Sequence, residues 1–301
     1  MFSYTALRNH FGKLSLDNSS ANLTLGDTLI NSFYRRILRK GNWPFLERTG
    51  SITTVASTQF YDLFFNYRKL LDSPYLTVSS TQYPMTEVTT RAQWNILNQT
   101  TTTTSNQPTH YYIFNGEIGI YPTSASAGNT LTVPYLIRVK DLSVADYTTG
   151  TIVTAPNGDE TITGSGTTWT SQMAGRWMRI TDADAAGSGD GVWYEIDSVT
   201  STTVLELVEK YNGTSIATGS AAYTIGQMSV LPEEFHETPV YGALWVYFTS
   251  VKPEPTRAQL YKELYTDDIR DLLKDQGSKT TSPATDSEIY DLLNPNLYVS
   301  L

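Results

Sequence analysis

The sequence changes character between residues 147 and 227, and this change constrains the fold more than any other feature. In this segment Thr, Gly and Ser dominate, the apolar runs are short, and no helical period is present. The apolar runs are spaced like the strands of a small sandwich or barrel; they are Ile152-Val153, Trp177–Ile180, Val192–Ile196 and Val204–Leu207. Because helical patterns occur on both sides, the sequence predicts an inserted β-domain, residues 147–227, within a parent domain formed by residues 1–146 and 228–301.

Helical patterns define both halves of the parent domain. From Thr24 to Lys40, apolar side chains recur about every three or four residues, and Gly41 follows as a stop signal. After the β-domain, one apolar pattern runs from Leu231 to Phe248 and begins with a proline and two acidic residues, as helices often do. A further pattern runs from Thr256 to Gly277. We therefore expect one helix before the β-domain and two after it.

The first half of the parent domain also carries strand signals, which begin with short β-rich runs between residues 51 and 88. The clearest hairpin joins His110–Phe114 to Glu117–Tyr121 through Asn115-Gly116, a pair that favours a two-residue turn with positive φ. With a third strand at Thr130–Val139, these segments predict a three-stranded meander. The expected fold class is α+β: a helical-bundle parent domain with a small antiparallel sheet, carrying an inserted all-β domain that resembles a sandwich or barrel.

The composition excludes several classes of protein. The 301 residues include no cysteine, so disulfides, Cys-ligated metals and thiol nucleophiles are ruled out. The net charge of −9 and the pI of about 4.8 argue against tight nucleic-acid binding, because phosphate contacts need a basic surface. The longest apolar run, Val240–Phe248, is too short for a bilayer span, and the first residues lack the pattern of a secretory signal. We therefore expect no membrane segment and synthesis inside a cell.

Candidate catalytic and metal-binding residues are few. Glu233-Glu234 is an acid pair at a predicted helix start, where the helix dipole favours negative charge; a glycosidase role is the alternative. The string Asp182–Gly187, followed by Asp190, has three positions of a calcium loop, but Trp193 stands where the bidentate Glu belongs. We interpret this string as a solvated turn. The three histidines lie far apart in the sequence, at His10, His110 and His236. We expect no cofactor, no metal and no enzymatic activity.

Aromatic and basic residues suggest possible binding surfaces. Arg35, Arg36 and Arg39 crowd the last turns of the first helix, where they either complement the helix dipole or face an acidic or nucleic-acid partner. The tryptophans of the β-domain either fill its core, the interpretation that we favour, or stack on sugar rings; they are Trp169, Trp177 and Trp193.

The end of the chain combines a polar stretch, residues 278–288, with large apolar residues after it. These apolar residues are Ile289, Tyr290, Leu292, Leu293, Leu297, Tyr298 and Leu301. Because a solvated tail gains nothing from such side chains, we expect residues 278–301 to form an extended tail that docks. It packs either as a last strand on its own domain or on a partner.

Three groups of residues resemble the head–tail connector, or adaptor, proteins of tailed bacteriophages, and a fourth resembles another module of virion proteins. The opening helix with Trp43-Pro44-Phe45, the sheet motif at residues 108–122 and 130–135, and the helix start at residues 231–237 with 241–244 resemble that family. Separately, residues 163–169, 175–177 and 193–196 are similar to a small β-module found in several virion proteins.

This resemblance implies a non-enzymatic virion protein at the head–tail junction, made in the host bacterial cytoplasm. It implies a ring, usually of twelve copies, that binds the portal protein and a tail or tail-completion protein and encloses the channel for double-stranded DNA. The apolar tail would anchor to the portal or to a neighbouring subunit. As candidates for the subunit interface we name Arg35, Arg36, Arg39, Tyr261 and Tyr265.

Two other functions remain open at this point. The chain would be a tail or decoration protein whose β-domain binds host-surface glycans, or a virion muramidase acting through Glu233 or Glu234.

Overall fold

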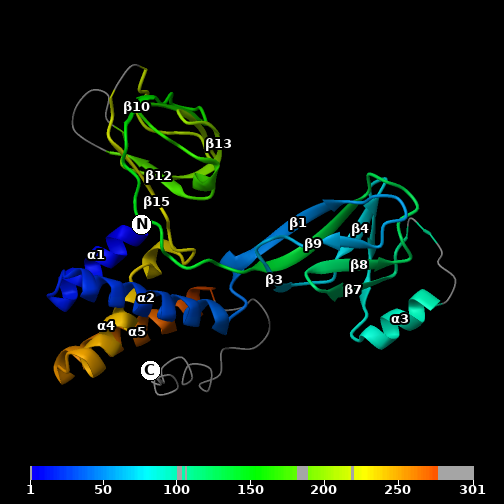
Figure 1. Cartoon of the computed structure of the whole chain (residues 1–301), viewed down its shortest axis with the longest axis horizontal. Coiled ribbons are helices and arrows are strands. Elements are labelled where there is room, and N and C mark those ends of the chain that lie inside the picture. The colour runs from blue at the N-terminus through cyan, green and yellow to red at the C-terminus, as the bar shows by residue number, and fades with distance from the viewer. Residues whose placement is uncertain (1, 100–103, 106, 182–188, 218–219, 277–301) are drawn as a thin grey trace. The chain divides into compact units, whose positions relative to one another are not determined.

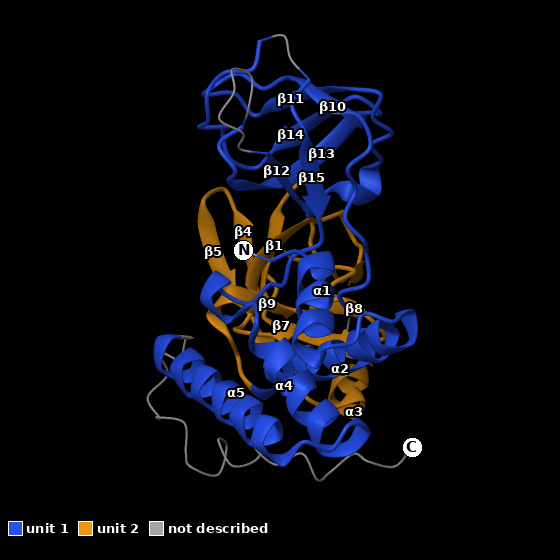
Figure 2. Ribbon diagram, turned by 90° about the vertical axis from the view of Figure 1, so that its left-hand side faces the viewer, with its two compact units in different colours: residues 1–40, 141–301 blue, residues 41–140 orange. Residues whose placement is uncertain are grey.

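A computed structural model of the chain describes residues 2–99, 104–105, 107–181, 189–217 and 220–276 (Figure 1). The fold is α+β, as expected. Contacts divide the chain into two compact units: residues 1–40 with 141–301 form unit 1, and residues 41–140 form unit 2 (Figure 2). The predicted β-domain lies entirely within unit 1, and its standing as a separate domain remains a prediction.

Four helices of unit 1 pack against one another. They are α1 (Tyr4–Ser15), α2 (Ser20–Lys40), α4 (Thr238–Val246) and α5 (Pro255–Gln276), and a π-helical turn, Tyr247–Val251, extends α4. The predicted first helix is therefore α2, which begins four residues earlier than Thr24 because the Ser19 hydroxyl accepts the Asn22 N–H at 3.3 Å. Helix α1 was not predicted, although Ser3 caps it by accepting the Ala6 N–H.

Aromatic side chains fill the space between these helices. Phe33 on α2 packs edge-on against Tyr265 on α5, with ring centroids 5.2 Å apart. Gly242 of α4 lies directly beneath Phe33, and a Cβ at that position would come within 2.4 Å of the ring. The glycine therefore allows α4 to approach α2 closely.

Unit 2 contains two sheets, whose strands are mostly antiparallel, and one short helix. One sheet has the order β1-β9-β4-β5, with β3 also paired to β9, and the other has the order β2-β8-β7-β6. The strands are β1 (Glu47–Thr53), β2 (Phe60–Asp62), β3 (Tyr67–Leu70), β4 (Tyr75–Val78), β5 (Thr81–Pro84), β6 (Thr86–Glu87), β7 (His110–Phe114), β8 (Glu117–Tyr121) and β9 (Thr130–Ile137). Helix α3 (Arg91–Gln99) was not predicted.

The predicted hairpin is confirmed, whereas the predicted meander is wrong. Strands β7 and β8 pair antiparallel, and both Asn115 and Gly116 have positive φ, at 53° and 82°. The third strand, β9, does not extend this hairpin. It lies in the other sheet, between β1 on one side and β3 and β4 on the other. Its apolar residues are buried on both faces, so β9 is a central strand that needs partners from distant parts of the chain.

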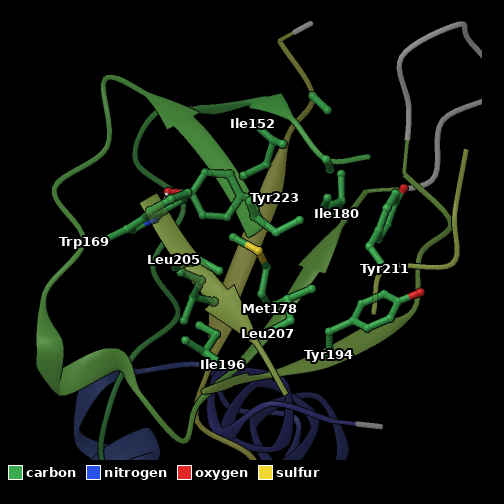
Figure 3. Packing of buried hydrophobic residues seen from close by; sticks show 14 of the residues in the cluster. Ile152, Trp169, Met178, Ile180, Tyr194, Ile196, Leu205, Leu207, Tyr211 and Tyr223 are labelled. Atoms are coloured by element: carbon green, nitrogen blue, oxygen red, sulfur yellow. Dashed lines mark hydrogen bonds between the residues drawn. The ribbon is translucent and has the colours of Figure 1, made fainter. Parts of the chain in front are cut away.

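The β-domain contains a single curved sheet with the order β10-β11-β14-β13-β12-β15. Its strands are β10 (Thr151–Thr154), β11 (Thr161–Ser165), β12 (Trp177–Ile180), β13 (Trp193–Ser201), β14 (Val204–Leu207) and β15 (Tyr223–Gly226). Isolated bridges join Tyr147 to Ile225 and Ile152 to Ala221, so the two ends of the strand order meet. The sheet therefore curls around a core of large apolar side chains (Figure 3).

Candidate interaction surfaces

A hydrogen-bond network ties the two ends of the β-domain to the start of α1. The Gln227 carboxamide accepts the Ser143 N–H at 2.8 Å and donates to the Asp141 carbonyl at 2.9 Å. The Ser3 hydroxyl donates to Asp146 Oδ2 at 2.8 Å, and the Tyr4 N–H donates to the Gln227 carbonyl. These bonds hold the entering and leaving segments side by side. Sequence reasoning missed them because each one joins residues that lie far apart in the chain.

One residue of the predicted basic cluster, Arg35, forms an ion pair within the chain. Arg35 Nη1 lies 2.6 Å from Asp141 Oδ2, and both side chains are more than two-fifths exposed. Such an exposed pair contributes about 0–1 kcal/mol to stability. Arg39 lies in the last turn of α2, as the helix-dipole interpretation expects, and Arg36 and Arg39 also have interaction partners.

The two predicted interface tyrosines are buried among the helices. Tyr265 is fully buried against Phe33, and Tyr261 stacks on Phe248 with centroids 5.7 Å apart. Both rings therefore contribute to the subunit's own core, and this placement offers no surface to a neighbour. Their role in a subunit contact remains an untested prediction.

An exposed apolar row follows the outer side of α5. Leu260 and Leu264, four residues apart, are 49% and 37% exposed, whereas Tyr261, Tyr265 and Ile269 on the same helix are buried. Residues at i and i+4 lie above one another on one helix face, so the two leucines form a continuous apolar strip. This strip is a candidate contact surface that the earlier interface prediction did not include.

The tryptophans of the β-domain occupy two different environments. Trp169 is buried in the core, where its Nε1 donates to the Tyr223 hydroxyl at 2.9 Å and its ring packs edge-on against Tyr223 (Figure 3). Trp177 and Trp193 are only half-buried and lie outside the core. The Arg179 guanidinium lies 4.9 Å from the centroid of the Trp193 ring. The core interpretation therefore holds for Trp169 and is wrong for Trp177 and Trp193.

The candidate catalytic residues do not form a reaction site in the described part of the chain. Glu233 and Glu234 lie exposed to solvent in a 3-10 turn, Glu233–Phe235, and so lack the burial of a general acid in a glycosidase site. Among the described residues, no group of His, Asp and Glu side chains is arranged to hold a metal ion. The calcium-like string falls mostly on residues 182–188, which lie outside the described residues. None of the described helices combines the length and apolar character that a bilayer span requires.

Two buried ionisable groups have displaced pKa values. Burial lowers the pKa of His236 below its ordinary value; its Nδ1 accepts the Phe2 N–H at 3.1 Å and its Nε2 donates to the Leu231 carbonyl. Burial raises the pKa of Asp268, although the Thr238 hydroxyl donates to its Oδ2 at 2.7 Å. Both groups hold segments together within unit 1. We see no reaction that either group serves.

The predicted tail lies outside the described residues. This applies to all seven of its candidate anchors, which are Ile289, Tyr290, Leu292, Leu293, Leu297, Tyr298 and Leu301.

Comparison with known families places these surfaces in context. The model of one protein family, described as SU10 adaptor protein, matches residues 3–186. The match takes in α1, α2, the whole of unit 2 and the β-domain as far as β12. No curated protein matches the chain. Because the family match covers more than half of the sequence, the chain belongs to the SU10 adaptor protein family, a family of phage adaptors.

Proposed function

We propose that this phage structural adaptor forms a ring, of twelve copies, between the portal and the tail, and that the ring encloses the channel for DNA. The observation that carries the proposal is the family match, which extends over α1, α2 and both sheets of unit 2. The role needs interaction surfaces rather than a reaction site. The exposed surfaces described above fit that requirement.

The apolar strip on α5 is the surface that we assign to ring closure. A ring of identical subunits needs a heterologous contact, in which one surface meets a different surface of the next copy. The helix has 22 residues, and Leu260 and Leu264 expose apolar area to solvent among the described residues. Burying this strip would add hydrophobic stabilisation to each contact.

The charge of the chain suits a channel that DNA must pass. Its 30 acidic residues outnumber the 21 basic ones. A negatively charged surface does not retain the duplex. Binding to DNA needs cationic side chains that replace the counterions around the phosphates.

The apolar tail is our candidate for the portal anchor. The test mixes the protein with its portal protein and examines the complexes by electron microscopy and co-sedimentation. We expect rings on the portal with the full chain, and loss of portal binding without loss of fold when the chain is cut before Asp286. Unchanged binding by the shortened chain would remove the anchor from the proposal.

A second pair of variants tests ring closure. Leu260→Glu with Leu264→Glu should abolish rings, because each carboxylate would be buried at the contact. The matched control is Ile96→Glu on α3, which also places a charge at an exposed apolar position, 62% accessible, but in unit 2. Failure of the full chain to form any assembly with the portal would overturn the proposed function itself.

The outward tryptophans favour one alternative function. Trp177 and Trp193 are outside the core, so the β-domain has aromatic rings that can stack on sugars. A glycan array probed with the full chain and with Trp177→Ala plus Trp193→Ala tests this alternative. Binding that depends on both rings would support a host-recognition role, and absence of binding would remove it.

A further inference from the structure

Strand β1 is an open edge of its sheet. It pairs with β9 on one side, and none of the described strands pairs with its other side. The Thr54 N–H donates to the Asn129 carbonyl at 2.8 Å, so Thr54 faces β9, and so do the even-numbered residues of β1. Pro134 lies opposite Thr49, and its carbonyl accepts the Leu71 N–H on the side of β9 that faces away from β1. Pro134 therefore forms no bond with Thr49, which agrees with this alternation. The N–H and C=O groups of Thr49, Ser51 and Thr53 therefore point away from the sheet.

These outward backbone groups have no hydrogen-bond partner among the described residues. The strand is seven residues long, and only its first two residues, Glu47 and Arg48, are charged. From Thr49 to Thr53 it has no charge and no proline. Such an edge is a template for another strand, and proteins normally protect one against unwanted pairing.

The other edges in the described structure are protected. Strand β5 has four residues and ends at Pro84, whose missing N–H would otherwise point outward. Strand β3 has four residues and carries Arg68 and Lys69. Strands β2 and β6 have only three and two residues, and bridges join the ends of the sheet in the β-domain. The lack of protection at β1 therefore indicates that something covers it in the assembled state.

An apolar surface borders this edge on one face of the sheet. Ile52 is half-buried against the core of unit 2, and the Phe64 ring covers Gly50, where a Cβ would come within 2.1 Å of it. A strand added beside β1 would place every second side chain next to Ile52 and Phe64. The best occupant is thus a short extended segment with apolar residues at alternate positions and no charge.

We propose that the last five residues of a second copy, Leu297–Leu301, add to β1 as an extra strand. This assignment rests on the proposed function, since a ring places a neighbouring copy beside each subunit; the portal anchor then falls to the apolar residues of the tail before Leu297. Leu297, Val299 and Leu301 alternate with Tyr298 and Ser300, and no side chain from Leu292 to Leu301 carries a charge at neutral pH. The uncharged part of β1, Thr49–Thr53, has the same length. The residues between α5 and Leu297 span roughly 60–70 Å when extended, which is enough to reach another subunit.

The primary experiment measures binding of a labelled peptide, residues 286–301, to the chain shortened to residues 1–276. Ser51→Pro removes an outward N–H without removing a bond to β9. It should weaken binding of the peptide by about ten-fold. Ser51→Val is the matched control, because it alters the side chain and keeps the N–H; we expect it to bind the peptide as the original does. A peptide carrying Val299→Pro should not bind.

Hydrogen exchange on the original sequence tests the same contact without a substitution, so misfolding of a variant cannot explain the result. The peptide should slow exchange of the Thr49, Ser51 and Thr53 amides, and in the full chain the same protection should rise with protein concentration. No peptide binding, or equal binding by Ser51→Pro and Ser51→Val, would overturn the proposal. Protection in the full chain that does not depend on concentration would also overturn it, because the tail would then pair within its own subunit.

Failure of the strand assignment can be distinguished from failure of the proposed function. If Ser51→Pro forms normal rings on the portal and β1 stays unprotected there, the strand assignment fails while the adaptor role stands.

Discussion

The β-domain and unit 2 of this adaptor differ in whether the edge strands of their sheets are paired. In the β-domain, bridges such as Tyr147 to Ile225 join the two ends of the sheet, so its described strands leave no long open edge. In unit 2, the larger sheet ends at β1, whose outward amides have no partner among the described residues, and at β5, which ends at Pro84. A closed sheet satisfies its own hydrogen bonds and is self-contained, whereas an open edge is available to a partner. From this difference we expect the contacts of the proposed ring to come from unit 2 and the helices rather than from the β-domain.

The largest expected effect comes from the core that closes the β-domain. Trp169→Ala should lower the free energy of unfolding of this domain by about 3–5 kcal/mol, because it leaves a large cavity and the Tyr223 hydroxyl loses the indole donor. Denaturant unfolding followed by circular dichroism would measure the loss.

Trp177→Ala is the matched control for that prediction. Trp177 is half-buried and outside the core, so its removal should cost about 1 kcal/mol. Equal losses at the two positions would contradict the view that the sheet closes around Trp169.

A smaller effect is expected at the junction beside α1, and it depends on pH. Burial holds the pKa of His236 below its ordinary value of 6.5, so the folded protein keeps the ring neutral while the unfolded chain takes up a proton. The stability from this group is complete above about pH 6.5 and falls as the solution is acidified below it. Protonation of Nδ1 would also remove the acceptor of the Phe2 N–H.

The free energy of unfolding, measured at about pH 7.5 and about pH 5.5, should therefore fall less in His236→Gln than in the original chain. Asp268 acts in the opposite direction, because burial raises its pKa and acidification then favours the folded state. That contribution is common to both proteins and cancels in their difference. An equal pH dependence in the two proteins would show that His236 does not carry the effect.

Strand pairing between neighbouring parts of the chain could be predicted from the sequence, whereas pairing between distant parts could not. The β7–β8 hairpin was found because its turn, Asn115-Gly116, is encoded by two adjacent residues. The partner of β9 was not found, since β1 precedes it by some eighty positions and nothing local specifies that pairing. Helix α3 escaped notice because only one of its side chains, Trp94, is buried, so it shows no apolar stripe.

The environment of the tryptophans was equally hard to predict. In the run Trp177-Met178-Arg179-Ile180, two adjacent residues are apolar, so alternation alone does not say which of them faces inward. The structure buries Met178 and leaves Trp177 only half-buried, because Met178 shares its face with Ile180. The candidate surfaces differ in the same way. Arg35 was named from its place in the last turns of a predicted helix, and its role in a subunit contact stays a prediction, whereas the open edge of β1 depends on a sheet order that no local pattern reveals.

Opening the protected edge of unit 2 should produce a modest gain in association. Pro84→Thr would supply an outward N–H on β5, and we expect the self-association constant to rise about three- to ten-fold, as measured by sedimentation velocity. The control Gln82→Thr changes a side chain on the same strand without adding a donor. A similar rise in both variants would mean that the added N–H is not responsible.

The smallest effect on assembly is expected from removing the closed sheet altogether. Tyr147 and Ile225 exchange two backbone hydrogen bonds, at 2.9 and 2.8 Å, and such a pair can be joined by a two-residue Asn-Gly turn in place of residues 148–224. This deletion keeps Asp146 and Gln227, and therefore the network that holds the start of α1. We expect the shortened chain to retain its helical circular dichroism and to form rings on the portal in electron micrographs as the full chain does. Gln227→Ala in the full chain is the informative companion, since it spares the β-domain and removes the network. If the deletion abolishes rings while the helices stay folded, the β-domain contributes to the contact between subunits, and a closed sheet is not by itself a sign of independence from the assembly.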